Sequence, residues 1–166
     1  MTNKKLEMAM DEIKVHRDEV VDKLLNFSGT DVLLFWGKDE ELIEKQEKIW
    51  APILAWAGKE FNTRYCITND IEVPNQHKNS EDNFKEFVNE LSDKELAAFY
   101  LASVNTKSEI LAAALVKGQI SAEQAYSASC LEETWQSEHW GKDEVSECGR
   151  ELLKSELSDI EIFLKR

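Results

Sequence analysis

The second half of the chain carries three successive four-residue motifs of the kind that begin α-helices. They are Ser92–Glu95, Thr106–Glu109 and Ser121–Gln124, each with a hydroxyl residue first and Glu or Gln fourth. In such a capping box, the two side chains satisfy backbone N–H groups that the first helical turn leaves unbonded. Apolar residues follow each motif at the three- to four-residue spacing of an amphipathic helix. Helices therefore dominate the prediction for this half.

The remainder of the chain also favours helices. The apolar spacing near the N-terminus predicts a helix that breaks around Val15–Arg17 and ends before Gly29. A second helix starts at about Asp39, and Pro52 either kinks it or begins another one. A last helix starts near Asp143. With six Gly and two Pro in the whole chain, little of the sequence favours loops.

Two short segments predict β-strands. Asp31–Trp36 is an apolar run between two glycines, and Arg64–Thr68 is rich in β-favouring residues. Because a helix separates them, we expect a parallel pair with a right-handed crossover, followed by a long loop over Asn69–Asn79. The predicted fold class is mostly α, a multi-helix domain with a small two-stranded parallel β pair, which is α+β by strict counting. It forms one domain over residues 1–166.

Charge and composition narrow the class of function. The 166 residues include 20 Lys and Arg against 33 Asp and Glu, so the formal net charge is −13. Nucleic-acid binding needs clustered cations to neutralise phosphates, so we expect no nucleic-acid partner. No apolar run approaches the roughly 20 residues of a membrane helix, so we expect no membrane insertion. Met1–Glu12 shows no signal-peptide core, which favours a cytoplasmic protein.

Common catalytic and cofactor signatures are absent from the sequence. It contains no phosphate-binding loop, dinucleotide fingerprint, zinc-protease motif or serine-hydrolase elbow. The histidines, His16, His77 and His139, are far apart, and the three cysteines form neither a disulfide framework nor a zinc motif. These absences remove the simple arguments for an enzyme without excluding an unusual one, and we expect no cofactor, metal or small-molecule substrate.

The segment 130–141 is the most informative part of the chain. On a helix, Trp135, Gln136 and His139 lie three, four and seven residues beyond Glu132, so all four share one face. Trp140, next to Gly141, is a candidate exposed anchor, because Trp is enriched among interface hot spots. Two other interpretations remain open. In the first, Glu132 has a structural role and hydrogen-bonds to a neighbouring helix end or pairs with His139. In the second, Glu132 and His139 form the acid–base pair of an enzyme cleft.

Several of these segments resemble a known family. Ser121–Ala125, Leu131–Gln136 and Trp140–Asp143 are similar to the C-terminal signature of the F1-ATP synthase assembly chaperones that bind the α subunit. Further segments resemble the family in order and spacing, so that the likeness covers essentially the whole chain: His16–Asp22, Gly29–Leu34, Gln46–Trp56 and Ile110–Gly118.

The resemblance implies a molecular chaperone that holds unassembled F1 α subunit until β subunits replace it. It implies cytoplasmic location in an α-proteobacterium, or the mitochondrial matrix in a eukaryote. The client-binding residues that we expect on this basis are Glu132, Trp135, Gln136, His139 and Trp140. The alternative is a general acidic, helical interaction module for a basic partner.

The sequence departs from the family pattern at several places. Family members carry an N-terminal β-rich domain, which nothing in this chain matches, so that Met1 resembles a point just past that domain. The family often has an acidic residue where Ala51 stands, and a Gly-Ser pair near Lys107 and Ser108. We expect these changes to affect client binding more than the fold.

Overall fold

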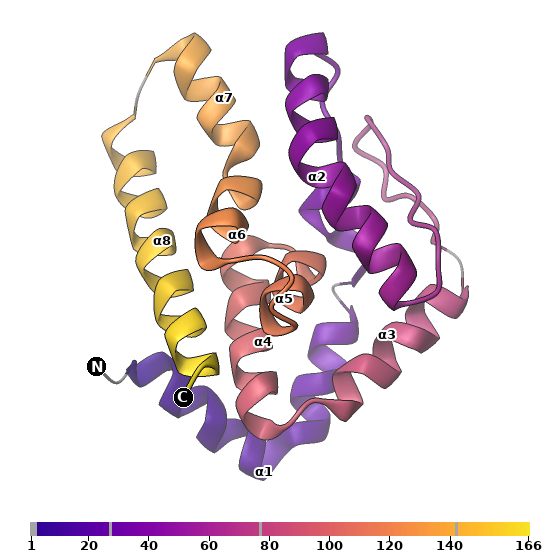
Figure 1. Cartoon of the computed structure of the whole chain (residues 1–166), viewed down its shortest axis with the longest axis vertical. Helices are drawn as coiled ribbons and strands as arrows, with labels where there is room; N and C mark the ends of the chain where they lie inside the picture. Colours follow the sequence, from indigo (N-terminus) through magenta and orange to yellow (C-terminus); the bar gives the residue numbers. More distant parts are fainter. Residues whose placement is uncertain (1–2, 27, 77, 142) are drawn as a thin grey trace.

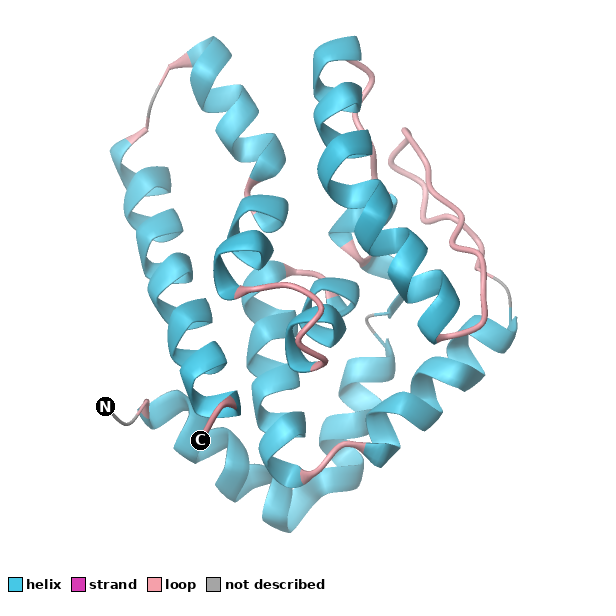
Figure 2. Cartoon of the chain, viewed as in Figure 1, coloured by secondary structure: helices cyan, strands magenta, loops and turns pink. Residues whose placement is uncertain are grey.

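Helices form nearly all of the regular structure in this chain (Figures 1 and 2). The computed structural model describes residues 3–26, 28–76, 78–141 and 143–166. Within them, the α-helices and the short 3-10 helices are α1 (Lys4–Asn26), η1 (Ser28–Thr30), η2 (Val32–Leu34), α2 (Glu40–Glu60), α3 (Lys78–Glu90), α4 (Asp93–Thr106), α5 (Glu109–Val116), α6 (Ala122–Ser129), α7 (Leu131–Trp140) and α8 (Glu144–Leu164).

Helix α5 lies at the centre of the molecule. Every residue from Glu109 to Leu115 is buried, as expected for a helix that is apolar on nearly all sides. It packs against α2, α4, α6 and α8, while α1 crosses α4 at the lower end of the view (Figure 1). The upper halves of α2 and α7 extend beyond this core, with α8 on the other side of α7 (Figure 1).

The predicted β pair is wrong. Residues 32–34 form the 3-10 turn η2, because Asp31 accepts the N–H of Leu33 and Phe35 donates to the carbonyl of Val32. Phe35 and Thr68 form an isolated parallel bridge, and no strand or sheet occurs among the described residues. The fold class is therefore all α: the Asp31 side chain diverts backbone donors into a local turn, and one bridge is too short to make a strand.

The local signals for helix starts and breaks have a mixed outcome. The boxes at Ser92 and Ser121 are confirmed, each with both reciprocal hydrogen bonds. The box at Thr106 is wrong, because Thr106 ends α4 and Ser108 caps α5. The break in α1 falls at His16, which has φ −129° and ψ 40°, and α2 continues through Pro52 as one helix.

The segment between α2 and α3 is irregular over residues 61–76, with turns, bends and the single bridge at Thr68. The predicted loop over Asn69–Asn79 therefore begins earlier than expected, because Arg64–Thr68 is not a strand, and it ends earlier, because α3 begins at Lys78. His77 lies outside the described residues. No helix in the described ranges combines the length and the apolar character that crossing a lipid bilayer requires.

Lys107 adopts a left-handed conformation where α4 ends, with φ 58° and ψ 27°. Its carbonyl accepts the N–H of Val32 at 3.1 Å, which ties this turn to the segment before α2. A side chain in this conformation costs roughly 1–2 kcal/mol, and Gly carries no such cost. The family resemblance places a Gly at or near this position.

We predict that Lys107→Gly stabilises the protein by about 1 kcal/mol and raises the melting temperature by about 2–4 °C. Lys117→Gly is the matched control, because Lys117 follows α5 with an ordinary φ of −78° and gains nothing from glycine. Thermal unfolding of both variants tests this expectation. A melting temperature that does not rise in Lys107→Gly contradicts it.

Candidate functional site

Helix α7 lies between two helices that hold it through different side chains. On the α8 side, Arg150 lies 3.8 Å from the carboxylate of Glu133 and donates to Ser137 at 3.4 Å. On the α2 side, Glu138 pairs with Lys45 at 3.3 Å. These contacts fix the rotation of α7 about its own axis and determine which of its residues remain toward solvent.

Glu132, Gln136 and Trp140 form one stripe along α7, because they are spaced four residues apart. We call these residues the α7 stripe. Glu132 is half-buried, Gln136 is exposed and Trp140 is 81% exposed. Glu132 has no hydrogen bond or ion pair with any residue that the structure describes, whereas Glu133 and Glu138 on the same helix are both paired.

Trp135 and His139 lie next to the stripe and contact each other. Their ring centroids are 4.3 Å apart at an angle of 31°. The His139 Nδ1 lies 2.8 Å from the carbonyl of Trp135, and its Nε2 lies 3.1 Å from Glu41 on α2. Because the Trp135 carbonyl accepts from the ring and Glu41 is negatively charged, the pKa of His139 is raised. The indole N–H of Trp135 is buried without a hydrogen-bond partner among the described residues.

The five expected site residues therefore fall into two adjacent groups on one helix. The α7 stripe ends in the exposed residues Gln136 and Trp140, whereas the Trp135–His139 pair lies toward α2, where His139 contacts Glu41. The interpretation that pairs Glu132 with His139 does not hold, since His139 binds Glu41. The same geometry removes the basis of the acid–base interpretation.

Helices α6 and α7 follow each other along the chain but are separate helices. The structure divides them at Cys130, whose φ and ψ are −97° and 9°. Ala125 and Ala128 are buried in the core below this break, and the carbonyl of Ala128 accepts the indole N–H of Trp50 on α2 at 2.8 Å. This bond between α2 and α6 holds the two helices together at the base of α7.

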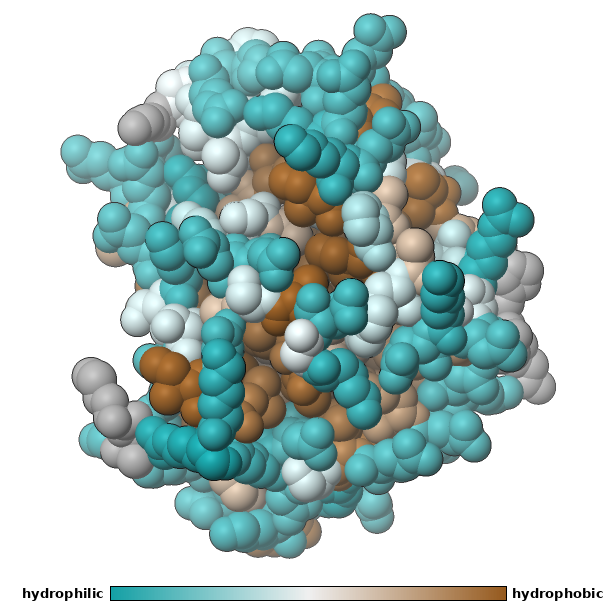
Figure 3. Space-filling view, in the orientation of Figure 1, coloured by the Kyte–Doolittle hydropathy of each residue, from teal (hydrophilic) through white to brown (hydrophobic). Residues whose placement is uncertain are grey.

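An apolar groove separates α2 from α6 on the face shown in Figure 3, where brown side chains run down the middle. Its volume is about 530 Å³. This groove was not predicted from the sequence. The residues that line it are Lys48, Ile49, Pro52, Ile53, Trp56, Gln119, Ile120, Glu123, Gln124 and Ser127.

Two buried acidic residues, Asp31 and Glu109, form a second feature that sequence analysis missed. Asp31 is 2% exposed and accepts the N–H groups of Leu33 and Ile110, each at 2.9 Å. Glu109 is 5% exposed, and neither of its carboxyl oxygens has a hydrogen-bond partner among the described residues. In the sequence, Glu109 is the fourth residue of an apparent capping box, so it was expected to cap a helix and not to be buried.

Burial changes the protonation of both acids. It raises the pKa of Asp31 to about 6, against the lowering effect of its backbone hydrogen bonds. Burial, and after it the charge of Asp31, raises the pKa of Glu109 to about 9. The same two causes, desolvation first, raise the pKa of the nearby Tyr65. Glu109 is therefore protonated at neutral pH.

Comparison with known proteins agrees with this architecture. A family model described as ATP12 chaperone protein matches residues 1–58. The crystal structure of Atp12 from Paracoccus denitrificans superimposes with a TM-score of 0.90 at 27% sequence identity, covering 95% of this chain and 68% of that one. The chain is therefore similar to ATP12 chaperone proteins in sequence and in fold.

Two further proteins, one described as a chaperone and one as atp12, are similar over most of this chain. A crystal structure from Agrobacterium tumefaciens has a TM-score of 0.82 at 26% identity and covers 98% of this chain and 65% of that one. The mitochondrial protein atp12 of Schizosaccharomyces pombe is 24% identical over 158 residues, which is 90% of this chain and 54% of the relative. The chain thus spans about half the length of that curated relative.

The protonated Glu109 predicts a specific dependence of stability on pH. Between the ordinary pKa of 4.5 and the folded value of about 9, the folded state binds more protons than the unfolded state. The free energy of unfolding therefore falls as pH rises, by up to about 1.4 kcal/mol per pH unit from this group. Glu109→Gln removes this contribution. Urea unfolding measures the free energy of unfolding at pH 6.5 and 8.5. Its decrease between these pH values should be larger in the natural protein than in Glu109→Gln, and equal decreases would contradict a raised pKa of Glu109.

Proposed function

We propose that this chain is an assembly chaperone that binds the unassembled F1 α subunit through α7 and is displaced when β subunits cover the same surface. An unassembled subunit exposes an oligomer interface, and large apolar patches of this kind self-associate. A temporary partner must cover that interface and later leave, so its affinity must lie below that of the final partner. The compartment would be the bacterial cytoplasm or the mitochondrial matrix.

One observation supports α7 as the binding surface above all others: the carboxylate of Glu132 is half-buried and has no partner in the part of the chain that the structure describes. The other two acidic residues of α7 have cationic partners within the chain. Glu132 retains its full capacity to accept hydrogen bonds from another protein. A charge-assisted hydrogen bond of this type contributes roughly 1.5–3 kcal/mol.

The rest of the α7 stripe suits the same role. Trp140 projects at the end of the helix with most of its ring exposed, and aromatic residues of this kind contribute strongly to binding energy once a partner covers them. Gln136, between Glu132 and Trp140, supplies an amide that can both donate and accept. His139 and Trp135, packed against each other, stiffen the neighbouring side of the helix.

The test compares two neighbouring glutamates. Binding of this chain to purified F1 α subunit is measured at physiological salt, first by co-elution in size-exclusion chromatography and then by titration. We predict that Glu132→Gln raises Kd by about 10- to 150-fold, the equivalent of 1.5–3 kcal/mol. Glu132→Lys should abolish co-elution, because it places a cation opposite the donor. Glu133→Gln is the control and should change Kd less than twofold.

Circular dichroism of each variant separates folding from binding. If Glu132→Lys loses its helical signal, Glu132 is structural and the proposed role is wrong. If binding of the natural protein disappears at modest salt and the two Gln variants weaken it equally, the chain is instead a general acidic module that recognises a basic partner.

A further inference from the structure

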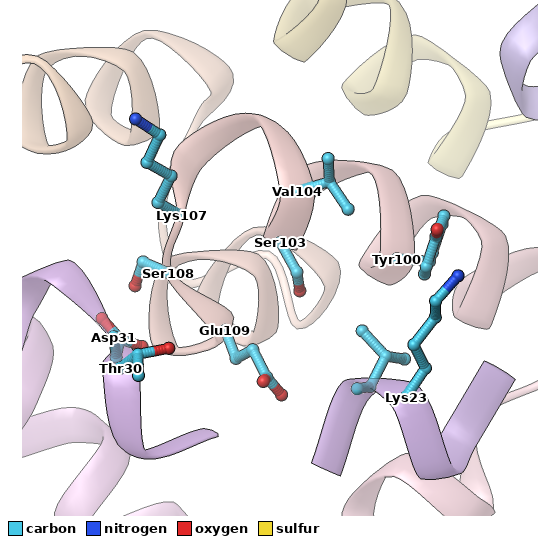
Figure 4. A pocket seen from close by; sticks show the side chains of 10 residues that line it. Lys23, Thr30, Asp31, Tyr100, Ser103, Val104, Lys107, Ser108 and Glu109 are labelled. Carbon is cyan, nitrogen blue, oxygen red and sulfur yellow. The ribbon is translucent and has the colours of Figure 1, made fainter. Parts of the chain in front are cut away.

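A cavity of about 490 Å³ opens between α1, α4 and α5, on a different part of the molecule from α7 (Figure 4). Its walls are largely apolar, with Leu24 from α1 and Val104 and Tyr100 from α4. Glu109 lines its inner end, and Ser103 lies above Glu109 on the neighbouring helix (Figure 4). The cavity has the size and apolar lining of sites that take one small group.

The two polar side chains at the inner end lack partners. Both carboxyl oxygens of Glu109 and the hydroxyl oxygen of Ser103 are buried without a hydrogen-bond partner among the described residues. Glu109 is 5% exposed and Ser103 is 8% exposed. Buried polar atoms are usually hydrogen-bonded, because leaving them unpaired costs roughly 1–3 kcal/mol each. Three such atoms at the end of one cavity indicate a missing binding partner.

We propose that this cavity binds the guanidinium group of an arginine side chain from a partner protein. A guanidinium is planar and presents parallel N–H groups, so it can bind both oxygens of one carboxylate at once. Glu109 is protonated in the free protein, so binding of the cation displaces that proton, and both carboxylate oxygens then accept guanidinium N–H groups. The Ser103 hydroxyl is a further acceptor that lines the same cavity. Guanidinium is also more weakly hydrated than ammonium, and its aliphatic stem suits walls made of Leu24, Val104 and Tyr100.

Two lysines that line the cavity influence how strongly it can bind a cation. Lys23 and Lys107 both line the cavity, and the Lys107 ammonium points away from Glu109, whereas Lys23 lies across the cavity beside Tyr100 (Figure 4). A cationic ligand must pass Lys23, so this residue lowers the affinity through charge repulsion. Removing its charge should therefore tighten binding.

The inference goes beyond the proposed function and does not depend on it. The cavity residues come from α1, η1, α4, α5 and the short segments beside them, and none belongs to the α7 stripe. Loss of F1 α subunit binding in Glu132 variants leaves this site unaffected, and the reverse also holds.

The experiment uses Nα-acetyl-arginine methylamide as the probe and follows the methyl signals of Leu24 and Val104 by NMR. We expect saturable shifts of both signals. The citrulline analogue has the same shape without the charge and should bind at least tenfold more weakly. Glu109→Gln should also weaken binding by tenfold or more, Ser103→Ala by a few-fold, and Lys23→Met should tighten it by a few-fold.

Other results would overturn the proposal. Equal binding of the arginine and citrulline probes would identify an apolar cavity without charge recognition. Tighter binding of free arginine than of the blocked form would assign the cavity to a small molecule instead of a protein side chain. If Lys23→Met lowers the melting temperature by several degrees, Lys23 itself is the partner of Glu109 and the carboxylate is not free for an arginine from another protein. Ser103→Ala removes an unpaired buried hydroxyl, so it keeps the test valid if Glu109→Gln fails to fold.

Discussion

The carboxylate of Asp31 holds the start of the central helix, and much of the structure depends on that contact. One oxygen accepts the N–H of Ile110 at the first turn of α5, and the other accepts the N–H of Leu33. Residues 79 positions apart are thereby joined inside the core. Because α5 packs against α2, α4, α6 and α8, its placement determines where the surrounding helices lie. Asp31 keeps these bonds even though burial disfavours its charge.

Local signals in the sequence predict local structure well and tertiary structure poorly. The helix starts at Ser92 and Ser121 could be predicted because the capping bonds join residues three positions apart. The strand pair could not be excluded, because the turn that replaces it depends on a buried Asp31 and on its bond to α5. Glu109 likewise matched a helix-start motif, and only the tertiary packing of α5 reveals a buried carboxyl without a partner among the described residues.

The candidate site shows the same division. Spacing along one helix correctly grouped Glu132 with Gln136, but the partner of His139 is Glu41, which is 98 residues away in the sequence. The family likeness, rather than periodicity, gave Glu132 its expected role in client binding. The structure shows how Glu132 differs from the other acidic residues of α7: Glu133 and Glu138 are paired, whereas Glu132 has no partner among the described residues. An unpaired charge that the fold itself does not use is suited to recognition of another protein.

The contacts that attach α7 to the rest of the fold also suit its proposed role in binding. Its base is fixed to the core at Leu131, which is 5% exposed, and its sides are held by ion pairs to α2 and α8. Binding then requires little ordering of the helix, which lowers the entropic cost of association. Because these ion pairs occupy the sides of α7 that face α2 and α8, the α7 stripe remains the side available to a partner.

Site-specific photo-crosslinking tests this account most directly. A photoreactive amino acid at Gln136 lies on the α7 stripe, whereas one at Thr134 is also exposed but lies on another side of the same helix. With purified F1 α subunit, the account predicts an efficient crosslink from position 136 and little from position 134. A crosslink from 134 alone, or equal yields from both positions, would contradict the claim that the α7 stripe is the client-binding surface.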